Sequence, residues 1–181
     1  MILCSNPRAQ YLSHKEEIDS SIQQVLSKGE FVLGENVHFF EEEFCEYIGT
    51  KHTVSVGSGT DALCLALRAL GLGPGDEVIA PSHTATATIA AIAAVGATAV
   101  LVDSEPSYYT IDPLAVSQAI SSKTKAVIVV HIYGQPVDMD GITSVVRQNN
   151  LKLIEDCAQA IGSTYHNRRV GSIGDLGCFS F

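Results

Sequence analysis

The stretch EVIAPSHTATATIAAIAAVGATAVLVD, residues 77–103, decides the fold class of this chain. It begins with a short apolar run, continues from Thr84 into an alanine-rich segment, and is interrupted at Gly96. A second apolar run then ends at Asp103. The pattern predicts a strand, a helix and a second strand. Strands without polar alternation are typical of a parallel sheet that is covered on both faces.

The same alternation continues on both sides of this stretch. Further strands are expected at residues 53–56, 125–131, 152–156 and 177–181, and helices at residues 14–28, 36–48, 61–70, 112–120 and 142–148. Asn36 and Asp112 are the expected N-caps of two of these helices. We therefore predict an α/β fold with a mostly parallel sheet sandwiched by helices. Ligands are expected at the carboxyl ends of its strands.

The composition excludes several classes of function. The formal net charge of −9, from 11 basic and 20 acidic residues, predicts binding neither to nucleic acid nor to an anionic membrane. We identify no secretory signal and no apolar stretch long enough to span a membrane. The histidines lack zinc-ligand spacing, so no metal site is expected. Five widely spaced cysteines favour reduced thiols and a cytoplasmic location. They are Cys4, Cys45, Cys64, Cys157 and Cys178.

Gly57, Ser58, Gly59 and Thr60 follow the first expected strand and directly precede a helix. Glycines let a ligand approach the backbone closely, and free N–H groups at a helix N-terminus favour an anion such as phosphate. An ordinary turn with a Ser or Thr cap explains the same residues, so both interpretations stay open. The stretch also fits a dinucleotide-binding fingerprint, but the next strand ends without the acidic residue that such a site requires.

Two further candidates lie at the ends of later strands. Asp156 ends the strand expected at residues 152–156, and Gln159 follows it. A carboxylate at the end of an apolar strand is costly to bury without a partner, and the protonated ring nitrogen of pyridoxal phosphate (PLP) is one such partner. Alternatively, Asp156 caps a following helix and Gln159 is a solvated helix residue. Ser180 could reach a bound phosphate, or it is simply a serine in the last strand.

Six stretches occur in a fixed order, and together they carry a family resemblance. They are FVLGENVHFFEEEF (31–44), VGSGTDAL (56–63), GPGDEVIAPSHTATAT (73–88), VHIYGQPVDMD (130–140), IEDCAQAIGSTYHNRRVG (154–171) and CFSF (178–181). The set resembles the N-terminal half of the DegT–StrS family of PLP-dependent sugar aminotransferases. The resemblance implies an aspartate-aminotransferase type of fold: residues 31–181 would be a truncated large domain, preceded by an N-terminal helical segment at residues 1–30.

The resemblance also implies an activity and a phosphate site. Members of the family transfer an amino group, usually from glutamate, to a keto group on a nucleotide-linked sugar, and they are homodimers with active sites at the subunit interface. In this sequence, Gly59 and Thr60 match the backbone donors to the cofactor phosphate. Ser58 is a weaker candidate beside them, and Ser180 matches a second phosphate ligand.

Contacts to the cofactor ring follow from the same resemblance. Asp156 matches the acid that pairs with the pyridine nitrogen, and Gln159 matches the residue near the 3-hydroxyl group. The family usually places an aromatic side chain over the ring at the position that is Ala85 here. His83 is the residue expected to stack on the ring instead.

The family's Schiff-base lysine would follow Phe181, so the resemblance places no catalytic residue within this chain. Lys125 and Lys152 begin strands and are expected at the wrong end of the sheet. We therefore expect the chain alone to bind PLP weakly and not to transaminate. Two alternatives stay open. One is a sugar dehydratase of the same family, in which histidine replaces the lysine, and the other is a non-catalytic remnant that binds a ligand or a partner protein.

Overall fold

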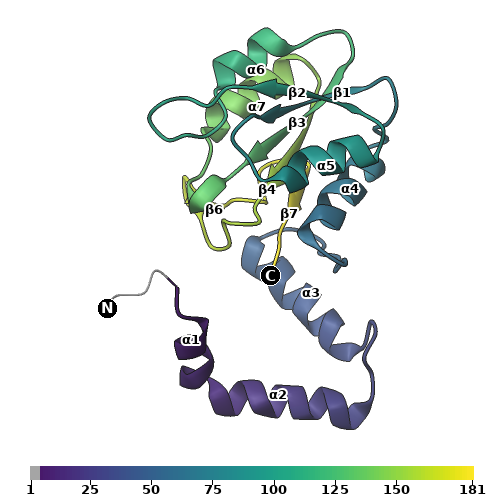
Figure 1. Ribbon diagram of the computed structural model, residues 1–181, viewed down its shortest axis with the longest axis vertical. Coiled ribbons are helices and arrows are strands. Elements are labelled where there is room, and N and C mark those ends of the chain that lie inside the picture. The colour runs from purple at the N-terminus through teal and green to yellow at the C-terminus, as the bar shows by residue number, and fades with distance from the viewer. Residues whose placement is uncertain (1–4) are drawn as a thin grey trace.

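The expected alternation of strands and helices produces a five-stranded sheet in the computed structural model, which describes residues 5–181 (Figure 1). Its strands are β1 (Glu77–Pro81), β2 (Thr98–Val102), β3 (Thr124–Val130), β4 (Lys152–Asp156) and β7 (Leu176–Cys178). Their order across the sheet is β2-β1-β3-β4-β7, and every neighbouring pair is parallel. The predicted α/β class with a mostly parallel sheet is confirmed.

Helices cover both faces of this sheet. They are α4 (Gly59–Ala69) and α5 (Thr86–Ala94) on one face, and α6 (Pro113–Ala119) and α7 (Met139–Gln148) on the other. Strand β3 contributes to both cores: Ala126 and Ile128 belong to the cluster with α4 and α5, whereas Val127 and Val129 belong to the cluster with α6 and α7. Because successive side chains of a strand point to opposite faces, burial on both faces requires a continuous apolar run.

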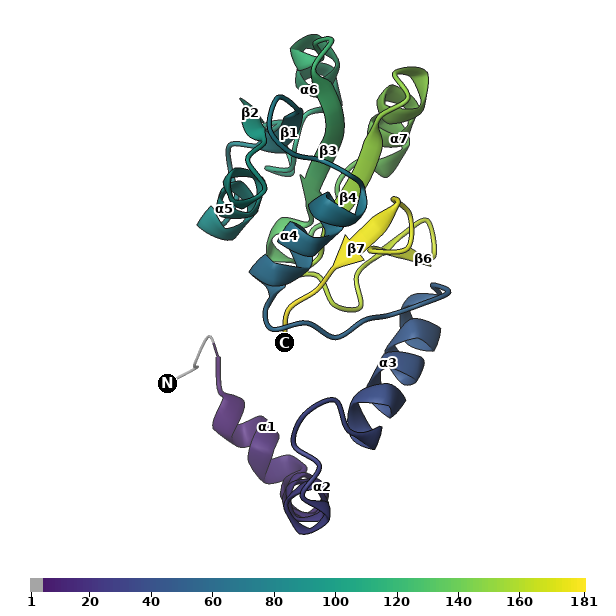
Figure 2. The same cartoon turned by 90° about the vertical axis from the view of Figure 1, so that its right-hand side faces the viewer.

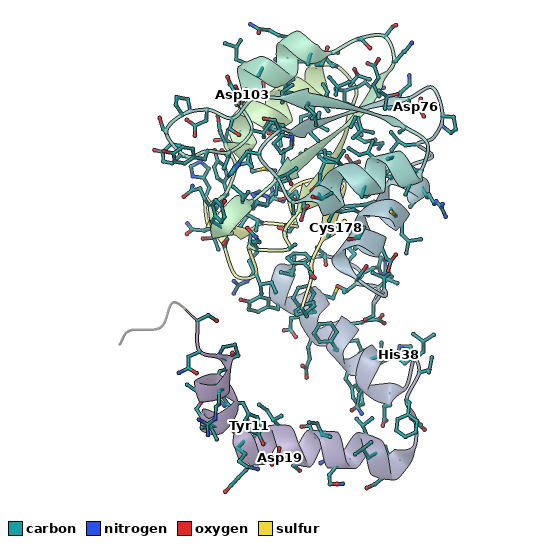
Figure 3. All side chains as sticks on the ribbon, in the orientation of Figure 1. Tyr11, Asp19, His38, Asp76, Asp103 and Cys178 are labelled. Atoms are coloured by element: carbon teal, nitrogen blue, oxygen red, sulfur yellow. The ribbon has the colours of Figure 1, made fainter. Side chains whose placement is uncertain are left out.

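The N-terminal helices α1 (Pro7–Ser13) and α2 (Lys15–Lys28) lie apart from the sheet in both views (Figures 1 and 2), and none of their residues is buried. Tyr11 joins them by donating a hydrogen bond to Asp19 Oδ1 at 3.0 Å (Figure 3). Helix α3 (Glu35–Ile48) returns to the sheet. The ring centroid of Phe44 lies 5.0 Å from that of Phe179 and 5.1 Å from that of Phe181. Among the described residues, no helix is both long enough and apolar enough to cross a bilayer.

The prediction of a strand at residues 53–56 is wrong. Within residues 5–181 this segment pairs with no strand, and β-prone residues form a strand only where a neighbouring strand completes the hydrogen bonds. The N–H of Ser55 instead donates to Glu41 Oε1 at 2.6 Å, and Val54 is 76% exposed. The last predicted strand is also shorter than expected, because β7 ends at Cys178.

The two predicted helix caps differ in outcome. Asp112 caps α6, and its side chain accepts a hydrogen bond from the N–H of Leu114 at 2.9 Å, as predicted. Asn36 is not a cap, because α3 already begins at Glu35 and Gly34 occupies the N-cap position.

Three short elements complete the described chain. They are η1 (Ile132–Gly134), β5 (Thr164–Tyr165) and β6 (Arg168–Arg169).

Candidate active site

The N-terminus of α4 lies against the last residues of the chain. A Cβ atom placed on Gly59 would lie 2.9 Å from Ser180 Cβ and 3.3 Å from Ser180 Oγ. Gly59 and Thr60 are the first two residues of α4, where backbone N–H groups lack helical partners. The structure therefore brings together Gly59, Thr60 and Ser180, which the sequence places at opposite ends of the sheet region.

Ser58 is the N-cap of α4. Its Oγ accepts a hydrogen bond from the N–H of Asp61 at 3.1 Å and donates to Asp61 Oδ2 at 2.9 Å. The capping interpretation of this serine is therefore confirmed. Because both contacts occupy its hydroxyl group, Ser58 has less capacity to bind an external anion than its neighbours Gly59 and Thr60.

Replacing Gly59 by alanine is expected to lower the free energy of unfolding by about 1–3 kcal/mol, because the new Cβ must displace Ser180. Urea denaturation measures the change. Gly73→Ala is the matched control, since a Cβ there meets only the carbonyl oxygen of Val95 at 3.7 Å. The double change Gly59→Ala with Ser180→Gly should recover the loss. An unchanged stability in Gly59→Ala would show that this contact is not tight.

Asp156 ends β4 as a buried carboxylate. Its Oδ2 accepts a hydrogen bond from Thr88 Oγ1 at 2.9 Å, and its Oδ1 accepts one from the N–H of Ala158 at 3.2 Å. Turns follow Asp156, and no helix follows it within the described chain. The alternative that Asp156 caps the next helix is therefore wrong. Sequence reasoning missed Thr88, because no short-range pattern indicates a contact with a residue on another element.

Gln159 and His83 meet at Tyr133. The N–H of Tyr133 donates to Gln159 Oε1 at 2.9 Å. The ring centroids of His83 and Tyr133 lie 5.8 Å apart. Tyr133 is exposed and has a positive φ of 56°, a conformation that a bulky residue adopts only under constraint. Ala85 is the exposed N-cap of α5. The alternative that Gln159 is a solvated helix residue is wrong as to the helix, since this exposed residue lies in a turn beside Tyr133.

Glu155 forms a second buried network on the opposite face of β4. Its carboxylate accepts hydrogen bonds from His131 Nε2 at 3.1 Å and from the N–H groups of Gly171, Ile173 and Gly174 at 2.8, 2.7 and 2.6 Å. His131 Nδ1 accepts the N–H of Val137 at 3.1 Å, so the proton of the neutral ring lies on Nε2. This network fixes the loop after β6 to the strand that carries Asp156.

Burial alone would raise the pKa of Glu155. Hydrogen bonds from His131 and from the N–H groups of Gly174 and Gly171 outweigh it and hold this pKa below its ordinary value of 4.5. Since the folded-state pKa is the lower one, the resulting stability is present above about pH 4.5 and is lost as the pH falls through the folded-state pKa.

Protein stability is therefore expected to decrease on acidification below about pH 4.5 as Glu155 takes up a proton. Urea denaturation at a series of pH values follows the stability. Carbon-13 NMR of the labelled glutamate carboxyl groups isolates Glu155 from the other acids. A titration midpoint for Glu155 at or above the ordinary glutamate value would contradict the prediction.

Cys157 lies beside this network, and His131, Glu155 and Cys157 form a group of metal-ligand types among residues 5–181. Both ring nitrogens and both carboxylate oxygens already take part in hydrogen bonds, so the group offers no free oxygen or nitrogen ligand. Burial raises the pKa of the Cys157 thiol, and it raises the pKa of Cys178 to about 12. Neither thiol is a nucleophile near neutral pH. Cys4 lies outside the described residues.

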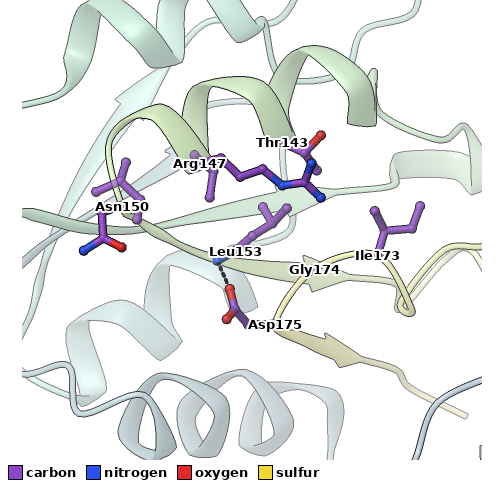
Figure 4. Close-up of a pocket in the computed structure, with 9 residues that line it drawn as sticks. Thr143, Arg147, Asn150, Leu153, Ile173, Gly174 and Asp175 are labelled. Atoms are coloured by element: carbon purple, nitrogen blue, oxygen red, sulfur yellow. Dashed lines mark hydrogen bonds between the residues drawn. The ribbon is translucent and has the colours of Figure 1, made fainter.

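An open pocket of about 370 Å³ lies at the other end of β4, between α7 and residues 173–175 (Figure 4). Arg147 and Asn150 line it from the helix side. Asp175 closes one edge by accepting the N–H of Leu153 at 2.9 Å and by pairing with Lys152 at 3.0 Å. No site residue expected from the sequence lines this pocket, so it is separate from the candidate site.

Comparison with known proteins places these residues in a family. A sequence model of the DegT/DnrJ/EryC1/StrS aminotransferase family matches residues 12–181. The chain is 48% identical over 170 residues to the dTDP-3-amino-3,6-dideoxy-alpha-D-galactopyranose transaminase of Aneurinibacillus thermoaerophilus. That alignment covers 94% of this chain and 47% of the relative, so the chain spans about half the relative's length.

Solved structures of aminotransferases also resemble this chain. DesV of Streptomyces venezuelae, solved in complex with a ketimine intermediate, matches with a TM-score of 0.95 and 45% identity over 97% of this chain and 47% of that chain. NtdA of Bacillus subtilis, with its bound cofactor PMP (the amino form of PLP), matches with a TM-score of 0.86 and 36% identity over 91% and 37%. As its motifs indicated, the chain belongs to the DegT/DnrJ/EryC1/StrS aminotransferase family.

Proposed function

We propose that this chain forms the PLP-binding half of an aminotransferase that moves an amino group, with glutamate as the expected donor, onto a nucleotide-linked keto sugar. Asp156 carries the proposal. Among residues 5–181 this buried carboxylate has no Lys, Arg or His partner within 4.0 Å. A buried anion is costly without a cation, and a protonated pyridine nitrogen would supply one. Relatives named as sugar transaminases support the activity.

The other end of the proposed site suits the cofactor phosphate. Gly59 lies so close to Ser180 that any Cβ would occupy the space between them. The N–H groups of Gly59 and Thr60 at the start of α4 and the hydroxyl groups of Thr60 and Ser180 are donors suited to a dianion. Ser58 remains a weaker candidate, because it caps α4.

PLP, when bound, would withdraw electrons from the substrate carbon that exchanges its proton. Asp156 would hold a proton on the ring nitrogen, which maintains that withdrawal. Gln159 accepts the N–H of Tyr133 through Oε1, so its amide N–H₂ group is free to donate to the ring's 3-oxygen. His83, beside Tyr133, would face the ring at the position left open by Ala85.

The remaining expectations extend the proposal to the whole protein. Lys125 and Lys152 lie at the starts of strands β3 and β4, at the end of the sheet opposite to Asp156, which supports a chain that by itself binds PLP weakly and does not transaminate. We propose an N-terminal helical segment at residues 1–30, of which residues 1–4 lie outside the described range, and we propose residues 31–181 as part of the large domain. Exposed apolar side chains on the N-terminal helical segment support a homodimer. The described cysteines are free thiols, consistent with a cytoplasmic location.

The encoded full-length protein, loaded with PLP, tests this function. It is incubated with glutamate and a panel of dTDP-linked and UDP-linked keto sugars, and 2-oxoglutarate and the amino sugar are quantified. The proposal predicts equal amounts of the two products. If the sugar loses water and no 2-oxoglutarate forms, the protein is a sugar dehydratase and the aminotransferase proposal fails. PLP binding with no sugar conversion, or no PLP binding, would favour a non-catalytic protein.

A further inference from the structure

Thr88 is a fully buried polar residue in α5, where the only other polar side chain, that of Thr86, is exposed. It lies in the first turn of α5, and its Oγ1 is 2.9 Å from Asp156 Oδ2 and 2.8 Å from Thr84 Oγ1. Valine has nearly the same shape and would fill the same volume without a polar atom. A buried hydroxyl group requires a hydrogen-bond partner, and valine would avoid that requirement. Threonine at this position therefore indicates a role for the hydroxyl group other than packing.

The directions of these hydrogen bonds follow from charge. An ionised carboxylate can only accept, so Thr88 donates to Asp156. The oxygen of Thr88 can then accept the proton of Thr84. The N–H of Ala158 binds the other carboxylate oxygen at 3.2 Å. Two aligned hydroxyl groups and one N–H thus hold the plane of the Asp156 carboxylate.

We propose that Thr88, supported by Thr84, is a positioning residue that holds the Asp156 carboxylate in the orientation in which it meets the cofactor ring nitrogen. This assignment rests on the proposed function. A positioning role depends on the hydroxyl group of Thr88 alone, whereas a packing role would also depend on its methyl group. Thr88→Val should therefore affect the cofactor, whereas Thr88→Ser, which keeps the hydroxyl group and loses a methyl group, should not.

The test uses the full-length protein with PLP labelled with nitrogen-15 in the ring. Wild type, Thr88→Val, Thr88→Ser and the exposed control Thr86→Val are compared by PLP titration and by the ring nitrogen-15 chemical shift across a pH series. In Thr88→Val, PLP affinity should fall about tenfold or more, and the ring nitrogen should lose its proton at lower pH than in wild type. Thr88→Ser should stay within about threefold of wild type, and Thr86→Val should be unchanged.

The outcomes separate this proposal from the proposed function. If wild type and Thr88→Val bind PLP equally with the same ring-nitrogen titration, the role of Thr88 is overturned while the proposed function stands. If Thr88→Ser is as impaired as Thr88→Val, the methyl group matters and Thr88 is only a packing residue. Wild type that binds no PLP would overturn the proposed function and, with it, the role of Thr88. Thermal unfolding of each cofactor-free variant identifies any general loss of structure.

Discussion

Asp156→Asn is expected to lower the rate of amino-group transfer from glutamate in the full-length protein by two to four orders of magnitude. Breaking a buried ion pair by removing one charge costs about 3–5 kcal/mol, which corresponds to this range of rates. The asparagine amide keeps the shape and still accepts a hydrogen bond from Thr88, but it carries no charge to hold a proton on the ring nitrogen. Stopped-flow absorbance of the PLP-loaded enzyme mixed with glutamate measures the rate.

Asp103→Asn is the matched control for this change. Asp103 also directly follows a strand of the sheet, but it is exposed and accepts the N–H of Ser104 at 2.8 Å. Its replacement should leave the rate within about twofold, because surface changes away from the site have small effects. Equal rates for Asp156→Asn and wild type would remove Asp156 from the reaction.

Glu155→Ala is expected to lower the free energy of unfolding by about 4–5 kcal/mol, which is much of the stability of a typical domain. The change leaves His131 Nε2–H and the N–H groups of Gly171, Ile173 and Gly174 without their acceptor in a buried place. Each unsatisfied buried donor costs about 1–3 kcal/mol, partly recovered where water enters. Urea denaturation measures the loss.

Glu155→Gln should lie between wild type and Glu155→Ala, because its single amide oxygen still accepts some of these hydrogen bonds. Glu46→Ala, an exposed glutamate on α3, is the control and should change stability by less than about 0.5 kcal/mol. A loss of under about 1 kcal/mol in Glu155→Ala would show that the loop at residues 171–174 does not depend on this carboxylate.

The strands of the sheet could be predicted from the sequence where a continuous apolar run marks a strand that is buried on both faces. The apolar run at residues 125–131 predicted β3 because both of its faces are buried. Residues 53–56 are also rich in β-prone residues and form no strand, because pairing depends on a neighbour that local sequence does not specify. The hairpin of β5 and β6 was missed, since His166 and Asn167 occupy its positive-φ turn in place of the usual glycine.

The candidate site was predictable to the level of strand ends. Parallel strands bring their carboxyl ends to one edge, which is why Asp156 and Ser180 could be expected near each other, and Asp156 does pair in register with Cys178, two residues before Ser180. Strand alternation also sends adjacent Glu155 and Asp156 to opposite faces, one to a structural network and the other to the site. The contact of Asp156 with Thr88 was not predictable, because it depends on how α5 packs on the sheet.

Equilibrium binding of PLP to the full-length protein tests the central claim most directly. The candidate site predicts saturable binding of one PLP per chain, competed by inorganic phosphate, and weakened both by Asp156→Ala at the ring nitrogen and by Gly59→Ala at the phosphate. Absorbance titration of the three proteins, with Asp103→Asn and Gly73→Ala as controls, gives the dissociation constants. Absence of saturable binding, or equal affinity in wild type, Asp156→Ala and Gly59→Ala, would contradict the claim.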